Sequence, residues 1–215
     1  MRITKHEHAT LEVVEDDVRL IIDPGKFSAP IAEAAGTVAI VITHEHDDHW
    51  TPEHLAAIRS QSPAVRVFGP EGVVRAAAAT ADGIDVERVA PGDAVEVGPF
   101  RLRFFGGRHA VIHPSIPVID NVGVLVNESL YYAGDSFVAP GVPVEVLAAP
   151  ANAPWMKISE VMDYIAAVAP QRAFPTHEML LSRAGKDLAN ARLRWSTEQA
   201  GGTYAALEPG DAIDL

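Results

Sequence analysis

The 215-residue sequence contains no cysteine, which excludes disulfide frameworks, thiolate metal ligands and cysteine nucleophiles. It also has no uninterrupted apolar run long enough to cross a bilayer. The N-terminal residues Met1 to His8 lack the apolar stretch of a secretory signal. We therefore expect a soluble, cytoplasmic protein that does not associate with membranes.

Positive charge is scarce as well. Lysine and arginine together number 17 against 29 aspartates and glutamates, which gives a formal net charge of -12. A chain with this charge repels a polyanion unless basic residues gather around one cleft. The arginines between Arg66 and Arg108 are instead scattered over separate predicted elements. This pattern disfavours nucleic acid as a ligand and favours a small-molecule substrate.

The order of the predicted elements indicates an α/β chain in which helices cover packed sheets. A length of 215 residues suits one domain, and no linker or low-complexity segment divides residues 1–215. Apolar patterning predicts strands at residues 10–15, 18–22, 38–42, 65–68, 100–104, 122–126, 129–133, 144–148, 173–175 and 203–206. Cap and proline signals predict helices from 51 to about 60, from about 70, from 159 to 168 and from 187 to 199.

Two short motifs occur twice in the chain. Pro91-Gly92-Asp93 returns as Pro209-Gly210-Asp211, and Thr43-His44-Glu45 returns as Thr176-His177-Glu178. One interpretation is that the chain consists of two similar αβ halves that face each other. The other is that Pro-Gly-Asp simply forms turns before strands.

The densest group of potential metal ligands is the segment Thr43-His44-Glu45-His46-Asp47-Asp48-His49. It directly follows the predicted buried strand 38–42. A turn that leaves a strand can aim the side chains at i and i+2 toward one point, and His44 and His46 have this spacing. Imidazole is the commonest metal ligand in proteins, and carboxylates add oxygen donors that offset the charge of a divalent ion. Asp48 and His49 follow at once, so a second ion beside the first is chemically reasonable. The alternative, a polar loop whose histidines face solvent, suits a lone histidine better than this cluster.

The run His44-Glu45-His46-Asp47-Asp48-His49 resembles the H-x-H-x-D-H signature of the metallo-β-lactamase superfamily. Four other segments resemble parts of the same family in the same order: Leu20-Ile21-Ile22-Asp23-Pro24-Gly25, Gly107-Arg108-His109-Ala110, Tyr132-Ala133-Gly134-Asp135-Ser136 and Pro175-Thr176-His177-Glu178. The resemblance covers nearly the whole chain. It implies a four-layer αββα sandwich of the metallo-β-lactamase type, with ligands from both halves meeting at one edge of the sheets.

The resemblance also implies a binuclear metal site. It assigns His44, His46 and His109 to one ion, Asp48, His49 and His177 to the other, and Asp135 to a bridge between them. His109, Asp135 and His177 each follow a predicted strand, where loops can converge on one site. His113 is the alternative to His109 as the third imidazole, and otherwise belongs to the substrate pocket or to a loop. We expect two divalent ions, zinc before manganese or iron, although these ligands suit all three.

Three further residues are expected near the site. His8 resembles a histidine that lies close to the metals without binding them in a subgroup of the family, and its alternative is a hydrogen-bonded strand residue. Asp23 is expected to accept a hydrogen bond from a ligating imidazole, and its alternative is a turn aspartate. Trp155 is expected in a substrate loop or in the core, whereas Trp50 and Trp195 are expected to pack.

These features predict a metal-dependent hydrolase. Two divalent ions about 3.5–4 Å apart lower the pKa of a bound water toward neutrality, and the resulting hydroxide attacks the substrate. Asp48 is the candidate to orient that nucleophile or to take its proton. We expect a small-molecule ester, lactone or phosphodiester as substrate, because the chain resembles the lactonase-like and phosphodiesterase-like branch of the family. The alternatives are a mononuclear iron dioxygenase of sulfur compounds and a non-catalytic metal-dependent binding domain.

Overall fold

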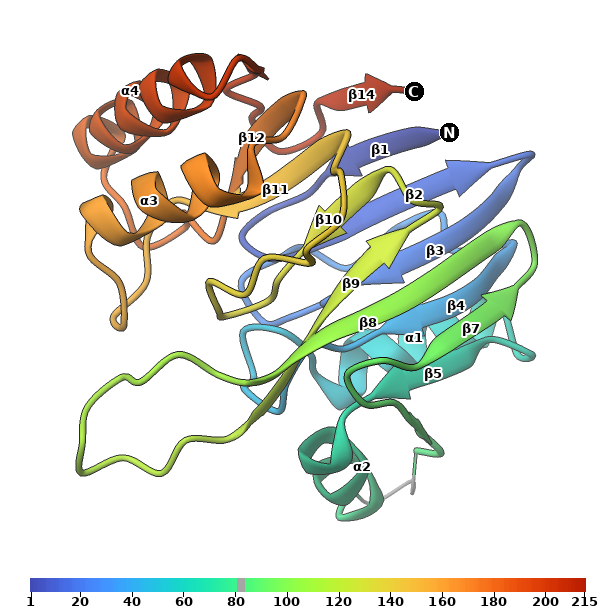
Figure 1. Cartoon of the computed structure of the whole chain (residues 1–215). Coiled ribbons are helices and arrows are strands. Elements are labelled where there is room, and N and C mark those ends of the chain that lie inside the picture. Colours follow the sequence, from blue (N-terminus) through green and yellow to red (C-terminus); the bar gives the residue numbers. More distant parts are fainter. Residues whose placement is uncertain (81–83) are drawn as a thin grey trace.

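Two β-sheets form the centre of the molecule in the computed structural model, which describes residues 1–80 and 84–215 (Figure 1). The N-terminal half contains β1 (Arg2–Lys5), β2 (Leu11–Glu15), β3 (Val18–Ile22), β4 (Thr37–Val41), α1 (Pro52–Gln61), β5 (Arg66–Gly69), α2 (Glu71–Ala78), β6 (Glu87–Arg88) and β7 (Ala94–Val97). The C-terminal half contains β8 (Phe100–Arg108), β9 (Asp120–Val126), β10 (Leu130–Tyr132), β11 (Val146–Pro150), α3 (Ile158–Val168), β12 (Arg172–Thr176), α4 (Arg183–Gln199), β13 (Thr203–Tyr204) and β14 (Ala212–Asp214). No helix in these residues is long and apolar enough to span a membrane.

The two halves have the same topology. In the described residues one sheet has the order β14-β1-β2-β3-β4-β5-β6, and the other has the order β7-β8-β9-β10-β11-β12-β13 when read from β7. In each order the first three pairs are antiparallel and the last three are parallel. The last strand of each half, β7 or β14, follows a Pro-Gly-Asp turn and joins the sheet of the other half. The prediction of two similar αβ halves is therefore confirmed.

The other repeated motif, Thr-His-Glu, does not reflect the symmetry of the two halves. Thr43-His44 follows β4, whereas Thr176-His177 follows β12, and β12 is the counterpart of β5 in the strand order. The two Thr-His-Glu motifs therefore do not occupy equivalent places in the halves.

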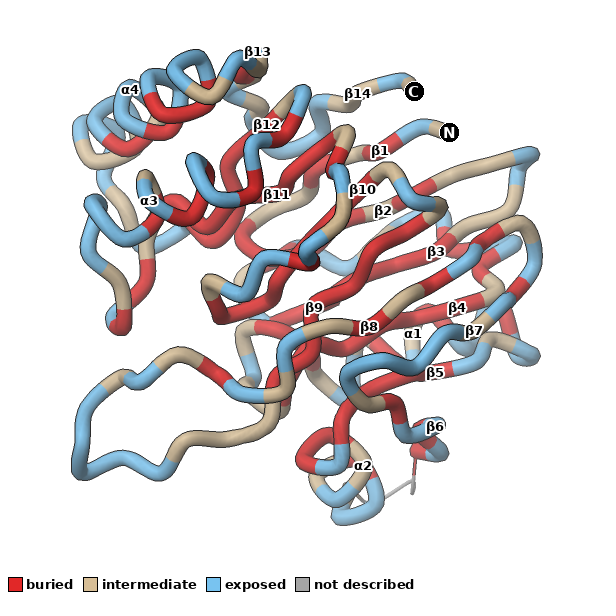
Figure 2. Tube along the Cα trace, viewed as in Figure 1, coloured by how far each residue is buried: buried red, intermediate tan, exposed pale blue. Residues whose placement is uncertain are grey.

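Helices cover the outer face of each sheet, which confirms the predicted four-layer αββα sandwich. Side chains alternate along each strand, so Leu20 and Ile22 of β3 lie in the inner core that the two sheets share, whereas Ile21 packs with Leu55 of α1. The other sheet packs its outer face in the same way against α3 and α4. Figure 2 shows the result, with buried strands in the middle and exposed outer faces on the helices.

Local sequence signals set the helix starts. Thr51 caps α1 by accepting a hydrogen bond from the backbone N–H of His54, and Pro52 occupies the first turn, as predicted. Helix α4 begins earlier than the predicted residue 187, because Ser182 accepts a hydrogen bond from the backbone N–H of Gly185 and caps it there. The start of α4 is therefore set by the Ser182 cap and not by the pattern that predicted residue 187.

The structure departs from the sequence predictions at β1, at Trp195 and at the end of β8. Strand β1 was not predicted, because its Lys5 is a charged residue that is buried through an ion pair of 2.5 Å with Glu178. Trp195 was expected to pack, but 52% of it is exposed, and it borders a groove between α3 and α4, whereas Trp50 is buried as expected. Strand β8 also continues beyond the predicted residue 104 to Arg108, so His109 leaves the strand directly.

Candidate metal centre

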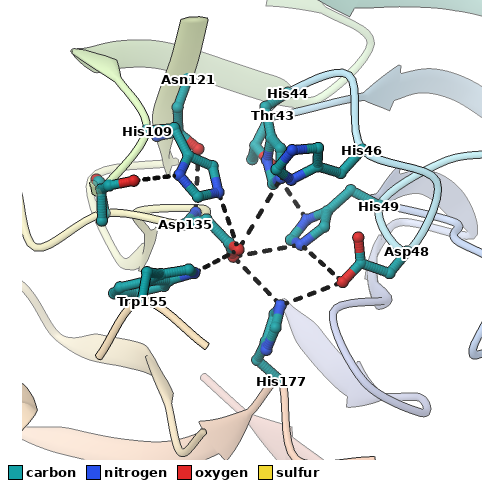
Figure 3. Close-up of polar contacts among 12 residues, drawn as sticks. Thr43, His44, His46, Asp48, His49, His109, Asn121, Asp135, Trp155 and His177 are labelled. Carbon is teal, nitrogen blue, oxygen red and sulfur yellow. Dashed lines mark hydrogen bonds and ion pairs between the residues drawn. The ribbon is translucent and has the colours of Figure 1, made fainter. Parts of the chain in front are cut away.

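Eight side chains that could bind metal, His8 among them, meet at one edge of the two sheets; Figure 3 labels the other seven. The loop between β4 and α1 supplies His44, His46, Asp48 and His49, while His109 follows β8, Asp135 follows β10 and His177 follows β12. These are the seven residues predicted as metal ligands. The structure brings all of them together.

The first group of donors comprises His44, His46, His109 and Asp135, whose donor atoms lie within 4.8 Å of one another. Nε2 of His44 is 3.1 Å from Nδ1 of His46. Nε2 of His109 is 3.3 Å from Oδ2 of Asp135. His44 is fully buried whereas His46 is half-buried, so solvent reaches this group on the His46 side.

The second group comprises His8, Asp48, His49 and His177, again with donor atoms within 4.8 Å of one another. Oδ2 of Asp48 lies 3.2 Å from Nε2 of His8, 3.5 Å from Nε2 of His177 and 4.0 Å from Nε2 of His49. The buried His8 ring also contacts the His177 ring, with 3.9 Å between the centroids and 44° between the ring planes. His8 therefore lies at the centre, where it holds Asp48 and is itself within reach of an ion.

Asp135 connects the two groups. Its Oδ1 lies 3.2 Å from Nε2 of His49 and 3.4 Å from Nε2 of His177. Its Oδ2 lies 3.3 Å from Nε2 of His109 and 4.0 Å from Nε2 of His44. The Asp135 carboxylate thus turns Oδ2 toward the first group and Oδ1 toward the second. The predicted bridging role requires this arrangement.

In every proposed ligand histidine except His46, Nδ1 is already engaged outside the centre. His109 and His177 donate from Nδ1 to the backbone carbonyls of Ala110 and Asn152, each at 2.6 Å. Such partners fix the tautomer and the orientation of a ligating ring, and they leave Nε2 free to bind an ion. Neither carbonyl was identified from the sequence, because a backbone acceptor has no residue signature.

Asp23 and Thr43 perform the same task for the motif histidines. Asp23 accepts from His49 Nδ1 at 2.6 Å, from the Thr43 hydroxyl at 2.7 Å and from the Thr43 backbone N–H at 2.8 Å. Because the Thr43 hydroxyl donates to Asp23, it can accept from His44 Nδ1, 3.0 Å away. Asp23 therefore lies where the sequence predicted, as the acceptor for a histidine of the motif.

The centre leaves buried polar atoms without partners. Nε2 of His49, His109 and His177 and Oδ1 of Asp135 are buried and have no hydrogen-bond partner among the described residues. An unpaired buried donor or acceptor costs about 1–3 kcal/mol. A divalent ion would satisfy several of these atoms at once, and imidazole with carboxylate is a donor set that such ions accept. The residues present therefore fit the predicted metals.

Protons are divided unevenly over the metal-free centre. Burial lowers the pKa of His44 well below its ordinary value. At the second group burial opposes protonation of His177, but the carboxylates of Asp135 and Asp48 outweigh it and raise the pKa of His177 to about 9. Asp135 likewise raises the pKa of His49 against the effect of burial. Without metal, protons therefore collect on His49 and His177.

Comparison with known proteins identifies the family. Residues 2–177 match the family described as the beta-lactamase superfamily domain. The chain belongs to the beta-lactamase superfamily. The resemblance drawn from the run His44 to His49 is thereby confirmed.

Relatives of this superfamily protein extend over its whole length. Protein Rv0786c of Mycobacterium tuberculosis is 38% identical over 219 residues, which cover 99% of each chain. Igni18, a metallo hydrolase from the archaeon Ignicoccus hospitalis, has a TM-score of 0.73 at 20% identity and covers 99% of this chain and 97% of its own. CmlA, a diiron β-hydroxylase from Streptomyces venezuelae, has a TM-score of 0.76 at 15% identity and covers 100% of this chain and 54% of its own. The two solved structures show the fold, on which one relative is a hydrolase and the other a hydroxylase.

The structure separates His109 from its alternative, His113. His113 is exposed, and its Nδ1 lies 2.7 Å from the Ser115 hydroxyl rather than near the centre. The reason is that the chain continues outward after His109 as a long loop that projects from the body (Figure 1). Of the alternatives for His113, the structure therefore supports a loop residue, and no contact places its side chain beside the ligands.

Two polar contacts complete the surroundings of Asp135. Trp155 is 9% exposed, and its Nε1 donates to Asp135 Oδ2 at 2.8 Å, so it belongs to the site rather than to the core alone. The buried Asn121 accepts from the Asp135 backbone N–H at 3.0 Å and donates to the Ala133 carbonyl at 2.9 Å. Asn121 was missed, because one asparagine at the start of a predicted strand forms no recognisable pattern.

Proposed function

We propose that the protein is a metal-dependent hydrolase with two divalent ions that acts on a small-molecule ester, lactone or phosphodiester. The observation that carries the proposal is the convergence of unpartnered buried Nε2 and carboxylate atoms from both halves at one edge of the sheets. Two divalent ions held there supply the acidity that turns water into hydroxide near neutral pH, and they polarise the acyl or phosphoryl oxygen of the substrate. Zinc is the first candidate.

The donors divide into two sets with one shared member. His44, His46 and His109 would hold one ion, Asp48, His49 and His177 would hold the other, and Asp135 would bind both. The engaged Nδ1 atoms orient the rings before an ion arrives, which lowers the cost of assembling the centre.

Asp48 is suited to orient the attacking water. Its side chain is 20% exposed, so it lies at the rim of the centre rather than inside it. Despite burial, the neighbouring imidazoles of His177 and His8 hold the pKa of Asp48 below its usual range, and it stays ionised. An ionised carboxylate accepts a hydrogen bond from water readily, whereas a group with so low a pKa is a weak general base at neutral pH.

The presence of two donor groups favours the two-ion hydrolase over the mononuclear iron dioxygenase. A single ion at His44, His46 and His109 would leave the Nε2 atoms of His49 and His177 buried without partners. The access to solvent at His46 and Asp48 also favours catalysis over a purely binding role, because an open metal position is typical of catalytic sites.

Exposed apolar side chains on segments that follow the ligands, and an apolar groove beside Asn152, support a small substrate with an apolar substituent. Val111 and Ile116 are exposed on the loop after His109, and Met179 and Leu180 are exposed just after His177. A groove of about 160 Å³ lies beside Asn152, the residue whose carbonyl holds His177, and is lined mainly by aliphatic side chains: Ala151, Met156, Ile158, Leu181, Leu188 and Ala189. The net charge of -12 also supports such a substrate over a nucleic acid.

The test is a substrate panel on protein that has been stripped of metal and reloaded separately with Zn²⁺, Mn²⁺ or Fe²⁺. We expect hydrolysis of at least one class among alkyl esters, lactones and phosphodiesters, lost on chelation and restored by metal. The proposal is wrong if metal-loaded protein hydrolyses none of them. One iron per chain together with oxygen uptake would support the dioxygenase instead.

A further inference from the structure

Trp155 makes a directed polar contact with the carboxylate between the two donor groups. It lies in the loop between β11 and α3, and its indole Nε1 donates to Oδ2 of Asp135 at 2.8 Å. Both side chains are buried, and Figure 3 shows the indole pointing at the carboxylate. A buried hydrogen bond to an ionised carboxylate is stronger than one between neutral groups.

This contact makes the two oxygens of Asp135 different. Oδ2 holds the indole N–H and lies 3.3 Å from Nε2 of His109. Oδ1 lies 3.2 Å from Nε2 of His49 and has no hydrogen-bond partner among the described residues. The indole thus fixes which oxygen faces which donor group.

A carboxylate that lacks this restraint can rotate about its terminal bond. It could then turn both oxygens toward one ion and leave the other ion without its shared ligand. We propose that Trp155 is a positioning residue that holds Asp135 across the two donor groups, and that its N–H is needed for the protein to hold two ions. This inference rests on the two-ion centre of the proposed function.

The packing of the indole supports a role for the N–H rather than for the ring alone. The Trp155 ring meets the Phe137 ring edge-on at 5.0 Å and the His109 ring at 6.0 Å between centroids. A phenylalanine at position 155 would retain an aromatic ring in this environment. Trp155→Phe therefore removes the hydrogen bond and keeps most of the packing.

The experiment is a Zn²⁺ titration of metal-stripped protein, with free and bound metal measured by equilibrium dialysis. For Trp155→Phe we expect the weaker of the two binding steps to lose about 10–100-fold in affinity, which is the usual effect of losing a residue that orients a ligand. At a Zn²⁺ concentration that just saturates the unaltered protein, the variant should hold close to one ion per chain. The matched control is Phe137→Leu, which disturbs the packing of Trp155 but keeps its N–H, and which should still hold two ions.

The outcomes separate this inference from the proposed function. Two ions bound with unchanged affinities in Trp155→Phe would overturn the positioning role alone, and so would an equal loss in Phe137→Leu. One ion per chain in the unaltered protein would overturn the two-ion centre and the positioning role together. Absence of hydrolysis in a protein that holds two ions would contradict only the proposed function.

A second measurement covers the case in which Trp155→Phe fails to fold. Indole N–H signals of the unaltered protein can be followed by NMR after ¹⁵N labelling of tryptophan, and Trp195→Phe assigns the exposed one. We expect an indole proton that exchanges slowly with solvent and shifts on metal loading, because the N–H stays on Asp135 in the loaded protein. Rapid exchange of both buried indole protons after loading would overturn the inference.

Discussion

At the scale of single residues, the centre depends on imidazoles whose outer nitrogen is already engaged. His49, His109 and His177 each present Nε2 inward because Nδ1 has a partner outside the centre. His46 is the exception, since its only polar side-chain contact among the described residues is with His44. It is also the least buried of the motif histidines, and its side chain belongs to none of the core clusters.

His46 is therefore the ligand that can be removed with least damage to the fold. We expect His46→Ala to bind about one ion instead of two and to lose at least about 100-fold in hydrolysis, the upper end for loss of ligand positioning. The thermal midpoint of the metal-free variant should change by no more than about 2 °C, as for a substitution outside the core. Metal analysis, the substrate assay and calorimetry check the three statements.

His113→Ala is the matched control, because it removes the same side chain from an exposed loop. It should retain both ions and full hydrolysis. The ligand assignment fails if His46→Ala keeps its activity, or if both variants lose it equally.

The raised pKa of His177 couples metal binding to proton release. At about 9, against an ordinary value of 6.5, this pKa keeps His177 protonated at pH 7, so an ion can bind its Nε2 only when the proton leaves. We expect proton release on metal binding, and an apparent affinity that falls by at least about tenfold for each pH unit below 9, because His49 in the same donor group also holds a proton. Calorimetric titration in buffers of different ionisation enthalpy measures the release. A binding heat that is independent of the buffer would contradict it.

The same shift predicts how the metal-free fold responds to pH. A pKa raised in the folded state stabilises the fold fully below the unfolded value of 6.5, and the contribution is lost as the pH rises through about 9. Metal-stripped protein should therefore lose stability over this window in urea unfolding. Replacement of His177 by alanine should reduce that loss, and the part that remains comes from His49, whose pKa is also raised.

How much of the centre the sequence reveals depends on the kind of residue. The seven proposed ligands were all predicted, because histidine and aspartate directly after strands form a recognisable pattern. Asn121 and the carbonyls of Ala110 and Asn152 were not, because hydrogen bonds to the backbone depend on how the loops fold. Trp155 was expected near the site, but its contact with Asp135 required the tertiary structure.

At the scale of elements, the turn after β10 places Asp135. Gly134 has a φ of +60°, and a Cβ there would lie 2.5 Å from Asn121 Oδ1 and 2.7 Å from Thr43 Cβ. Gly141 has a similar φ of +69° but open space around the same position. Alanine at Gly141 would therefore introduce backbone strain alone, whereas alanine at Gly134 would introduce the same strain and also displace residues of the site.

We expect Gly141→Ala to destabilise the fold by about 1–2 kcal/mol, the cost of a left-handed alanine, with metal content unchanged. Gly134→Ala should cost more and also lower the metal content, because Asn121 and Thr43 must move and both hold the centre. Urea unfolding and metal analysis of the two variants provide the comparison. Equal effects on metal content would show that the turn does not position Asp135.

The sequence predicted the longer elements better than the short ones. Strands β2, β3 and β4 follow apolar patterns, and α1 carries a cap and a proline at its start. Strand β1 was missed because the burial of Lys5 depends on Glu178, which lies near the other end of the chain. An ion pair of this kind cannot be recognised from the local pattern.

At the scale of the whole molecule, the centre joins the two halves. His44 to His49 come from one half, whereas His109, Asp135 and His177 come from the other. Bound ions would therefore link the halves across the edge of the sandwich. Sequence motifs predicted this layout, because the repeated Pro-Gly-Asp turns indicated two halves of one topology.

Metal removal should accordingly lower the stability of the entire fold. An ion present at a thousand times its dissociation constant stabilises the native state by about 4 kcal/mol. For a chain of this length that corresponds to a fall of roughly 8–16 °C in the thermal midpoint for each ion that chelation removes. Calorimetry with and without chelator measures it, and identical midpoints would contradict a structural link between the halves.

The number of ions that the centre holds is the most direct test of the two-ion hydrolase. Elemental analysis of the reloaded protein after removal of free metal gives the number of ions per chain. Two ions per chain, with hydrolysis that is lost when either is removed, is the predicted result. Full hydrolysis by a protein that holds one ion, or none, would contradict the two-ion centre.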